Sequence, residues 1–241
     1  MLIGFANQKG GCAKTTCCWG TASVLRSQGK SVLMVDLDPQ CSLSMLLNAD
    51  DSRTIGDVLK GKYAITDVVQ TIDKNGDMIA GSAELSLLSA SEINRLKEVL
   101  TEIDKYYDFV IVDSTPSMSA ISMSILNTIN KLIIPATASL PVILAITQFG
   151  NMIRLAKENN PTLEVSGILL VMFDKRAIVS RSMRETAENV AKNLGTRLFN
   201  TTIRKGVVVD EAFASFAGLI EYAPTSNVAL DYIDFVKELG V

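Results

Sequence analysis

The fold is decided by the stretch Gln8-Lys9-Gly10-Gly11-Cys12-Ala13-Lys14-Thr15-Thr16, which directly follows an apolar run from Leu2 to Ala6. The pattern predicts a buried strand, then a glycine-rich loop, then a helix that opens on a lysine and two threonines. Backbone N–H groups in such a loop point inward and bind phosphate, and the helix N-terminus adds partial positive charge. We expect Lys14 to reach the outer phosphates of a nucleotide and the Thr15 hydroxyl to ligate Mg²⁺.

Two residues of this loop depart from the common pattern. Lys9 stands five residues before Lys14, and an ordinary phosphate loop does not need it, so it indicates a particular branch of nucleotide-binding proteins. Ala13 occupies the last position before Lys14, where such loops usually carry glycine. If that position requires a positive φ angle, the methyl group of Ala13 costs about 1–2 kcal/mol.

Length and composition exclude several classes of protein. The 241 residues predict one domain that spans residues 1–241, and apolar residues make up 48% of the chain. No run reaches the roughly 18 apolar residues that span a bilayer. The chain has no histidine, which excludes Ser-His-Asp hydrolysis, histidine metal sites and histidine phosphotransfer. Any catalysis has to use carboxylates, lysines, backbone amides and a bound metal.

The four cysteines crowd into the first 41 residues without a paired C-x-x-C arrangement, which argues against a zinc site. Reduced thiols in a cytosolic protein are the simplest interpretation. Cys12 lies in the predicted phosphate nest beside Lys9 and Lys14, and such cations lower the pKa of a thiol. The alternative is that Cys12 is only a small residue tolerated in the loop.

Short apolar runs alternate with longer amphipathic stretches along the chain. The predicted strands are Leu2–Ala6, Ser31–Asp36, Phe109–Asp113, Lys131–Pro135 and Gly167–Met172. The predicted helices are Thr15–Gln28, Thr54–Leu59, Ser91–Lys105, Ser119–Asn130, Pro141–Glu158, Ser180–Leu194 and Asn227–Leu239. Nearly continuous apolar strands are typical of a parallel sheet covered on both faces. The alternation therefore predicts an α/β fold, with a doubly wound, mostly parallel sheet and helices on both faces.

Acidic residues follow two of the predicted strands, at the edge where ligands of open parallel sheets bind. Asp36 ends the second strand and Asp38 comes two residues later, and Asp113 ends the third strand. Buried carboxylates are costly unless a cation lies beside them. We expect Thr15, Asp38 and Asp113 to serve the metal, with Asp38 also orienting the attacking water and Asp36 supporting it. The alternative for each aspartate is a turn residue beside a proline.

The charge of the chain is uneven. The net charge is −3, yet residues 174–205 carry eight basic and three acidic side chains, a local charge of +5. Such a stretch is either a solvated helix face or a surface that contacts the duplex backbone without reading bases. The last predicted helix places Leu230, Ile233, Val236 and Leu239 on one side. Its other face is acidic, so we expect it to pack on the core rather than on a membrane, where basic residues are favoured.

Together these residues resemble the ParA/MinD/Soj family of deviant Walker A ATPases over nearly the whole chain. The loop from Lys9 to Thr16 is similar to the family pattern K-G-G-x-G-K-T-T, and the segment from Asp36 to Gln40 matches D-x-D-P-Q. The segment from Tyr107 to Ser117 resembles Y-D-x-x-x-x-D-x-P-P-S. The sequence differs from the family at Ala13, Thr115, Arg204 and Val208.

The resemblance implies a P-loop ATPase that uses ATP and Mg²⁺ and hydrolyses ATP slowly. It implies a homodimer that encloses ATP between subunits, with Lys9 touching the phosphates bound to the partner subunit and with Lys14 and Asp38 as further catalytic residues. The nucleotide-binding residues it implies are Lys9, Gly10, Gly11, Cys12, Ala13, Lys14, Thr15 and Thr16. By position and charge, we expect the DNA-binding face to include Arg181, Arg184, Arg204 and Lys205.

The implied role is partition of a plasmid or chromosome. The ATP-bound dimer would bind duplex DNA nonspecifically, in the cytoplasm and on the nucleoid, without a membrane. A ParB-like, centromere-binding partner would stimulate ATP hydrolysis and so release the dimer from DNA. The alternatives are a MinD-like or other cargo-positioning ATPase, the nitrogenase iron protein, a ligase resembling dethiobiotin synthetase, and a DNA-bound scaffold without turnover. The iron protein is disfavoured because no cysteine follows Cys41.

Overall fold

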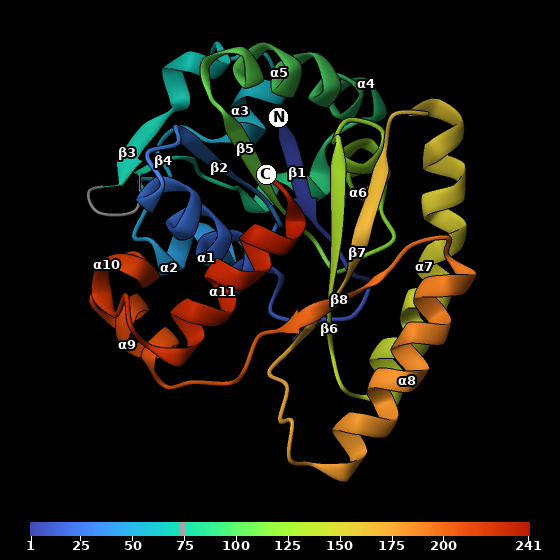
Figure 1. Ribbon diagram of the computed structural model, residues 1–241. Helices are drawn as coiled ribbons and strands as arrows, with labels where there is room; N and C mark the ends of the chain where they lie inside the picture. Colours follow the sequence, from blue (N-terminus) through green and yellow to red (C-terminus); the bar gives the residue numbers. More distant parts are fainter. Residues whose placement is uncertain (73–75) are drawn as a thin grey trace.

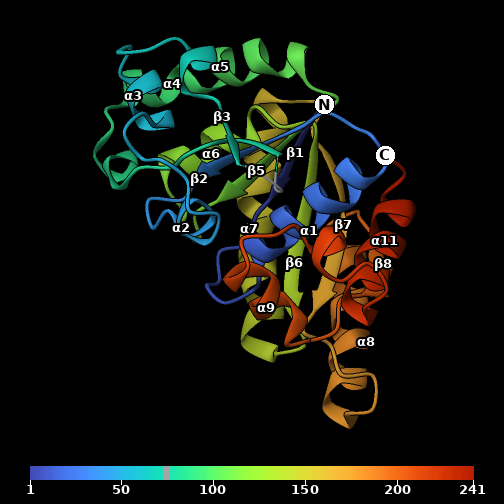
Figure 2. The same ribbon diagram turned by 90° about the vertical axis from the view of Figure 1, so that its left-hand side faces the viewer.

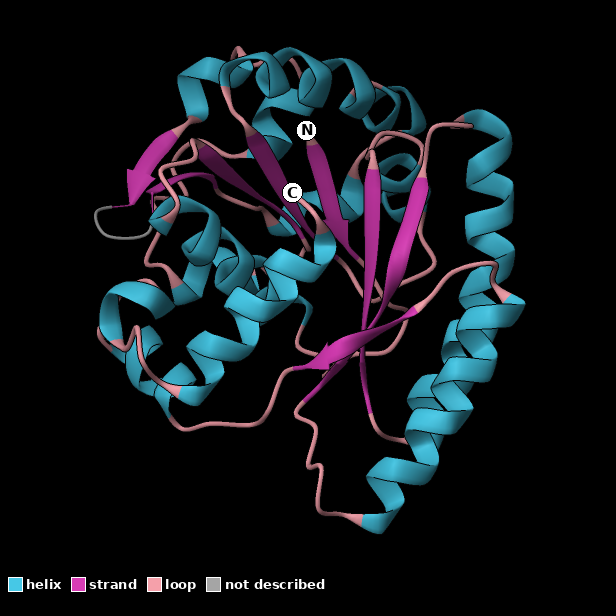
Figure 3. Ribbon diagram, in the orientation of Figure 1, coloured by secondary structure: helices cyan, strands magenta, loops and turns pink. Residues whose placement is uncertain are grey.

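The computed structural model describes residues 1–72 and 76–241. Its centre is an eight-stranded sheet in the order β3-β4-β2-β5-β1-β6-β7-β8, in which only the β3–β4 pair is antiparallel (Figures 1 and 3). The strands are β1 (Leu2–Phe5), β2 (Val32–Leu37), β3 (Gln70–Ile72), β4 (Gly76–Ile79), β5 (Phe109–Ser114), β6 (Lys131–Thr137), β7 (Glu164–Val171) and β8 (Leu198–Thr202). The predicted fold class is confirmed.

Helices cover both faces of this sheet (Figure 2). One face is covered by α1 (Lys14–Ser27), α2 (Ser42–Leu46), α9 (Val208–Ala214), α10 (Leu219–Tyr222) and α11 (Asn227–Leu239). The other is covered by α3 (Ile55–Leu59), α5 (Leu96–Ile103), α6 (Ala120–Leu126), α7 (Leu140–Asn159) and α8 (Ile178–Asn193), with α4 (Ala90–Asn94) beside α5 and α6. Short 3₁₀ helices are η1 (Ile65–Val68), η3 (Ala83–Leu87) and η4 (Asp104–Tyr106).

The strands are apolar on both sides because each side faces a different core. In β5, Val110 and Val112 contribute to one buried cluster, whereas Phe109 and Ile111 contribute to the other. Successive side chains of a strand point to opposite faces, so a strand between two helical layers has no polar side. The long apolar runs in the sequence follow from this arrangement.

The register of the central strands brings the polar strand ends together. β5 lies between β1 and β2, with Phe5 paired to Asp113 and Asp36 also paired to Asp113. The phosphate loop after β1 and the acidic residues of β2 and β5 therefore meet at one edge of the sheet. This is the edge where ligands of open parallel sheets bind.

All five predicted strands are present, but three further strands were missed. β3 and β4 are short, and β8, Leu-Phe-Asn-Thr-Thr, carries little apolar signal. β7 begins at Glu164 rather than Gly167. The helix predicted over 91–105 is divided into α4, α5 and η4.

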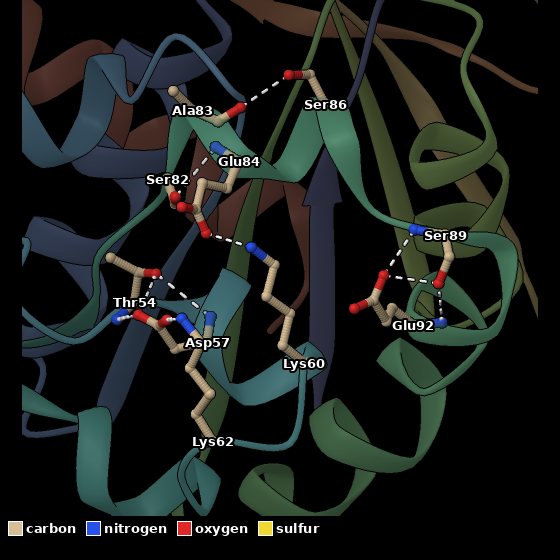
Figure 4. A network of polar contacts seen from close by, with 10 residues as sticks. All are labelled: Thr54, Asp57, Lys60, Lys62, Ser82, Ala83, Glu84, Ser86, Ser89 and Glu92. Atoms are coloured by element: carbon tan, nitrogen blue, oxygen red, sulfur yellow. Dashed lines mark hydrogen bonds and ion pairs between the residues drawn. The ribbon is translucent and has the colours of Figure 1, made fainter.

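Short helices near one end of the sheet begin with reciprocal side-chain caps, drawn in Figure 4. Thr54 and Asp57 form a capping box at α3, and Ser89 and Glu92 form another at α4. An ion pair between Lys60 and Glu84 ties the end of α3 to η3. These caps satisfy N–H groups that a short helix leaves unpaired.

The last helix packs on the core as predicted, and the predicted face is confirmed in part. Val236 and Leu239 are buried and Ile233 is partly buried against the core, whereas Leu230 is 47% exposed and Tyr232 and Phe235 are buried in addition. The helix is rotated because Asp231 and Tyr232 also turn inward, where they bond to Arg204 and to the Cys17 thiol. Within the described residues, no helix is long and apolar enough to cross a membrane.

The contact between α1 and α11 leads to a prediction about Gly20. A Cβ atom at Gly20 would lie 2.7 Å from two ring atoms of Tyr232, a side chain that is 1% exposed. Helix propensity alone would make Gly20→Ala stabilising by about 1 kcal/mol, whereas overpacking costs about 1–3 kcal/mol. Because the ring is buried and its hydroxyl donates to the Cys17 thiol, moving it would be costly, and we expect a net loss of stability, measured by urea denaturation. A gain in stability would show that this contact is looser than described.

Candidate phosphate and metal site

The loop between β1 and α1 is anchored at its start by Asn7. Its side-chain amide donates to the Pro135 carbonyl at 2.7 Å, and its side-chain oxygen accepts from the Lys9 N–H at 3.1 Å. Beyond this anchor the loop is open, since a Cβ atom placed on Gly10 or Gly11 would meet nothing within 4 Å. The loop therefore leaves room for a ligand against its backbone.

The helix that follows has its N-terminal groups available for an anion. Ala13 is the N-cap of α1 and provides no side-chain hydrogen bond, and the first turn contains no acidic residue. The first N–H groups of a helix need a partner from outside it. Their partial positive charge, in an open loop, favours phosphate.

Ala13 has the left-handed backbone conformation that the sequence led us to consider, with φ of 55° and ψ of 33°. An L-residue in this region costs about 1–2 kcal/mol, which glycine avoids. The chain thus carries backbone strain at the start of α1, one residue before Lys14.

The two lysines of the loop lie in different surroundings. Lys14 is buried at 7% exposure, and it forms no ion pair within residues 1–72 and 76–241. Lys9 is exposed and forms no ion pair among those same residues. Lys14 is placed to serve an anion within its own loop, and Lys9 is available to a ligand or chain outside it.

Asp36 is held by neighbours rather than left free. Its carboxylate accepts from the Ser44 N–H at 2.9 Å, the Ser44 hydroxyl at 2.7 Å and the Asp38 N–H at 3.1 Å. Burial raises its pKa, and the Ser44 bonds oppose that shift. Asp38 accepts from the Gln40 N–H at 3.0 Å. Asp36 therefore fixes the turn that carries Asp38, and Ser44, eight residues away, is a supporting residue that the sequence pattern did not reveal.

Asp113 is the least satisfied group of the site. It is fully buried, and neither carboxylate oxygen forms a hydrogen bond of good geometry within the described chain, although the Thr15 hydroxyl lies near enough to lower its pKa. Burial and the nearby charge of Asp36 raise its pKa to about 7, against the weaker opposing effects of Thr15 and Lys14. An orphaned buried carboxylate at a phosphate loop fits a cation or its bound water as the missing partner.

The residues present fit Mg²⁺ better than a metal held entirely by protein. In the part of the chain that the structure describes, no group of three or more His, Cys, Asp or Glu side chains is placed to hold an ion. Mg²⁺ is commonly bound by one or two carboxylates together with substrate phosphates and water. Asp113 and the half-buried Thr15 would be its protein partners. The charge of Asp38 also acts on Asp113, so Asp38 is near this position.

The interpretation of Cys12 as an activated thiol is wrong. Cys12 is 1% exposed, and burial raises the pKa of its thiol more strongly than Lys14 and Lys9 lower it. The side chain points into the core beside the loop, where it is part of an apolar cluster. Cys12 instead fits the alternative interpretation, a small residue that the loop tolerates.

A small pocket lies beside the loop, and a larger basic pocket adjoins the small one. The small pocket, about 140 Å³, includes among its lining residues Ala13, Thr16, Met172, Ile203, Val209 and Tyr232. The basic pocket, about 390 Å³, lies between the segments after β7 and β8 and includes Asp174, Lys175, Arg176, Arg204, Lys205 and Asp231. Met172, Arg204 and Lys205 line both pockets.

The four basic residues that we expected to bind DNA differ in whether their side chains already form ion pairs or hydrogen bonds. Arg204 donates to both carboxylate oxygens of Asp231 at 2.7 and 2.8 Å, and its N–H donates to the same group. Arg184 lies 3.5 Å from Glu188 and donates to the Phe199 carbonyl. Arg181 and Lys205 are exposed. The structure brings Arg204 and Lys205 into the basic pocket and leaves Arg181 and Arg184 on α8.

The chain is similar to known proteins over most of its length. A protein-family model described as an AAA domain matches residues 1–165. The sporulation initiation inhibitor protein Soj of Bacillus subtilis (strain 168) is 30% identical over 250 residues, covering 99% of this chain and 98% of its own. The chromosome partitioning protein ParA of Caulobacter vibrioides (strain NA1000 / CB15N) is 29% identical, covering 88% and 83%.

Solved structures share the fold. Cobyrinic acid a,c-diamide synthase from Mycobacterium smegmatis with bound ADP and magnesium has a TM-score of 0.83 at 26% identity, covering 98% of this chain and 92% of its own. The septum site-determining protein MinD of Pyrococcus horikoshii OT3, complexed with Mg-ADP, has a TM-score of 0.82 at 22% identity, covering 99% and 95%. At that identity the MinD structure supports the fold alone.

The strain at Ala13 leads to a prediction about stability. Ala13→Gly removes the left-handed penalty but adds the chain entropy of glycine, so we expect a gain of about 0.5–1 kcal/mol in the free energy of unfolding. Ala22→Gly is the matched control, because the same change within the regular helix α1 should destabilise by about 1 kcal/mol or more. Chemical denaturation without nucleotide measures both. Equal losses for the two variants would contradict the conformation of Ala13.

The raised pKa of Asp113 predicts a pH-dependent effect. In an unfolded chain an aspartate titrates near about 3.9, whereas in the fold the pKa of Asp113 is about 7. The folded protein binds this proton more tightly, so it loses stability as the pH rises from about 4 to about 7. Asp113→Asn should raise the free energy of unfolding by about 2–4 kcal/mol at pH 8, and the gain should vanish near pH 4.

This experiment uses the nucleotide-free protein. Asp234→Asn, an exposed position on α11, measures the effect of losing one surface charge. If Asp113→Asn changes the free energy of unfolding by the same amount at every pH, the result would argue against a buried, unpartnered carboxylate.

Proposed function

This chain belongs to the ParA/MinD family of ATPases, and on that premise we propose that it is a partition ATPase whose ATP-bound dimer binds DNA. The resemblance seen in the sequence is confirmed. Family membership also confirms the expected enzyme class, an ATP hydrolase. ATP and Mg²⁺ as cofactors are supported by the similar structures with bound ADP or ATP analogue and magnesium. The observation that carries the site assignment is the unpartnered carboxylate of Asp113 beside an open phosphate loop.

The proposed chemistry is phosphoryl transfer to water, with positioning and charge neutralisation as its main sources of rate. Bound Mg²⁺ would neutralise phosphate charge, with Thr15 and Asp113 as its protein partners. The loop N–H groups and Lys14 bind the phosphates. Asp38 orients the attacking water, and Asp36, held by Ser44, fixes the turn on which Asp38 stands.

Dimerisation through the phosphate-loop edge is supported by what that edge exposes. Lys9 is exposed there, available to phosphates bound to a second copy. Exposed apolar side chains follow the carboxyl ends of β5, β6 and β7, at Met118, Leu140 and Ile178. Clustered apolar side chains, Met among them, are enriched at the core of protein interfaces.

DNA binding is proposed from the basic residues of the 174–205 stretch and from the curated relatives named for chromosome partitioning. Phosphate contacts alone are enough for binding without sequence preference. A ParB-like protein is the proposed partner that stimulates hydrolysis, and the nucleoid in the cytoplasm is the proposed location. The cargo is proposed to be a plasmid or a chromosome.

Gel shifts of arbitrary duplex DNA with ATP, ADP or no nucleotide test this proposal. We expect binding only with ATP, and we expect it to weaken steeply with salt. Lys14→Ala should lower ATP affinity by at least about tenfold and remove the nucleotide dependence. Lys9→Ala should still bind ATP but fail to dimerise, which size-exclusion chromatography shows.

Lys30→Ala is the control, since Lys30 is an exposed lysine beyond the far end of α1. Binding of DNA that ignores the nucleotide, or an absence of binding at low salt, would disprove the proposed switch. Dimerisation of Lys9→Ala with ATP would disprove the assigned role of Lys9.

A further inference from the structure

Some basic side chains of the 174–205 stretch already form ion pairs or hydrogen bonds with other described residues of the protein, and others do not. Arg204 is bound by Asp231 and Arg184 by Glu188. Arg197 donates to the Ser166 and Glu238 carbonyls and stacks over the Phe199 ring at 4.7 Å. These three side chains already bind groups of the protein, so they are less available to bind a ligand.

Three other cations of the stretch meet in the basic pocket. Lys175 and Arg176 come from the segment after β7, and Lys205 comes from the segment after β8. The Phe173 N–H donates to the Ile203 carbonyl at 3.0 Å, which joins the two segments beside the pocket. Residues far apart in the sequence therefore present their charges to one place, as the adjoining ends of β7 and β8 in Figure 1 show.

The charges of this pocket are open to solvent. The side chain of Arg176 is 95% exposed, and its 3.7 Å contact with Asp174 is an exposed pair that contributes little energy. Within the described residues, Lys175 and Lys205 form no ion pair. An open rim of this kind admits the backbone of a duplex, whereas a small ligand there would stay largely in water.

The Arg204–Asp231 ion pair shapes the wall between the basic pocket and the small pocket. Arg204 lines both pockets, and Asp231 is 9% exposed and accepts from the Arg204 backbone as well as its guanidinium. The small pocket adjoins the phosphate loop through Ala13 and Thr16. A nucleotide that fills the small pocket would therefore contact the wall of the basic pocket.

We propose that the basic pocket is the subsite that binds a backbone phosphate of duplex DNA, with Lys175, Arg176 and Lys205 as its contacts. This inference rests on the proposed function. It keeps Lys205 as an expected DNA contact and replaces Arg181 and Arg184 of α8 with Lys175 and Arg176, which follow β7. Arg204 is a positioning residue in this subsite. The shared wall provides a physical route by which bound ATP favours DNA binding.

The test removes two cations that line only the basic pocket, in the double variant Lys175→Gln/Arg176→Gln. The matched control is Arg154→Gln/Lys157→Gln, which removes one arginine and one lysine from exposed positions on α7, outside the 174–205 stretch. DNA affinity with ATP is measured by fluorescence anisotropy over a range of salt concentrations. Each lost phosphate contact lowers the slope of log affinity against log salt by about 0.9.

We expect the pocket variant to lose about 1.8 from this slope and more than about tenfold in affinity, and the control to lose much less. A pocket variant that behaves like the control, while the unmodified chain binds DNA with ATP, would overturn this subsite alone. Failure of the unmodified chain to bind DNA would overturn the proposed function as well. Loss of binding for inorganic phosphate but not for DNA would assign the pocket to a free anion and also overturn the subsite.

Discussion

The structure depends on one unfavourable contact, the burial of the Asp113 carboxylate beside that of Asp36. The pairing of β5 with β2 puts these residues in register, and the sheet cannot form without bringing them together. Asp36 has three hydrogen-bond donors, whereas Asp113 has none of good geometry within the described chain. The difference leaves one carboxylate as a fixed part of the fold and the other in need of a cation.

The phosphate loop completes the same electrostatic arrangement. Its open glycines, the uncapped start of α1 and the buried ammonium group of Lys14 gather positive potential next to a buried acid. A triphosphate with Mg²⁺ contributes both the anion that the loop lacks and the cation that Asp113 lacks. Binding of the nucleotide therefore stabilises the folded protein. The backbone strain at Ala13 is a further unfavourable contribution to the free energy of the nucleotide-free protein.

The features that could be predicted from the sequence are those that local pattern determines. The phosphate loop, the strand-end aspartates and five of the strands each lie within one continuous segment, and α11 was predicted with its observed bounds. Contacts between distant segments could not be predicted in the same way. Ser44 reaches Asp36 through a turn, Asp231 binds Arg204 across 27 residues, and burial of Cys12 depends on the surrounding core. The sequence placed Arg204 on a charged surface, but only tertiary structure reveals that Asp231 already binds it.

Calorimetry of Mg–ATP binding near pH 7 in two buffers with different heats of ionisation tests the central claim most directly. With a pKa of about 7, part of Asp113 is protonated before binding, and the cation has to displace that proton. The account predicts a binding heat that depends on the buffer through proton release, with the release lost in Asp113→Asn. No binding heat, or the same proton release in Asp113→Asn, would contradict it.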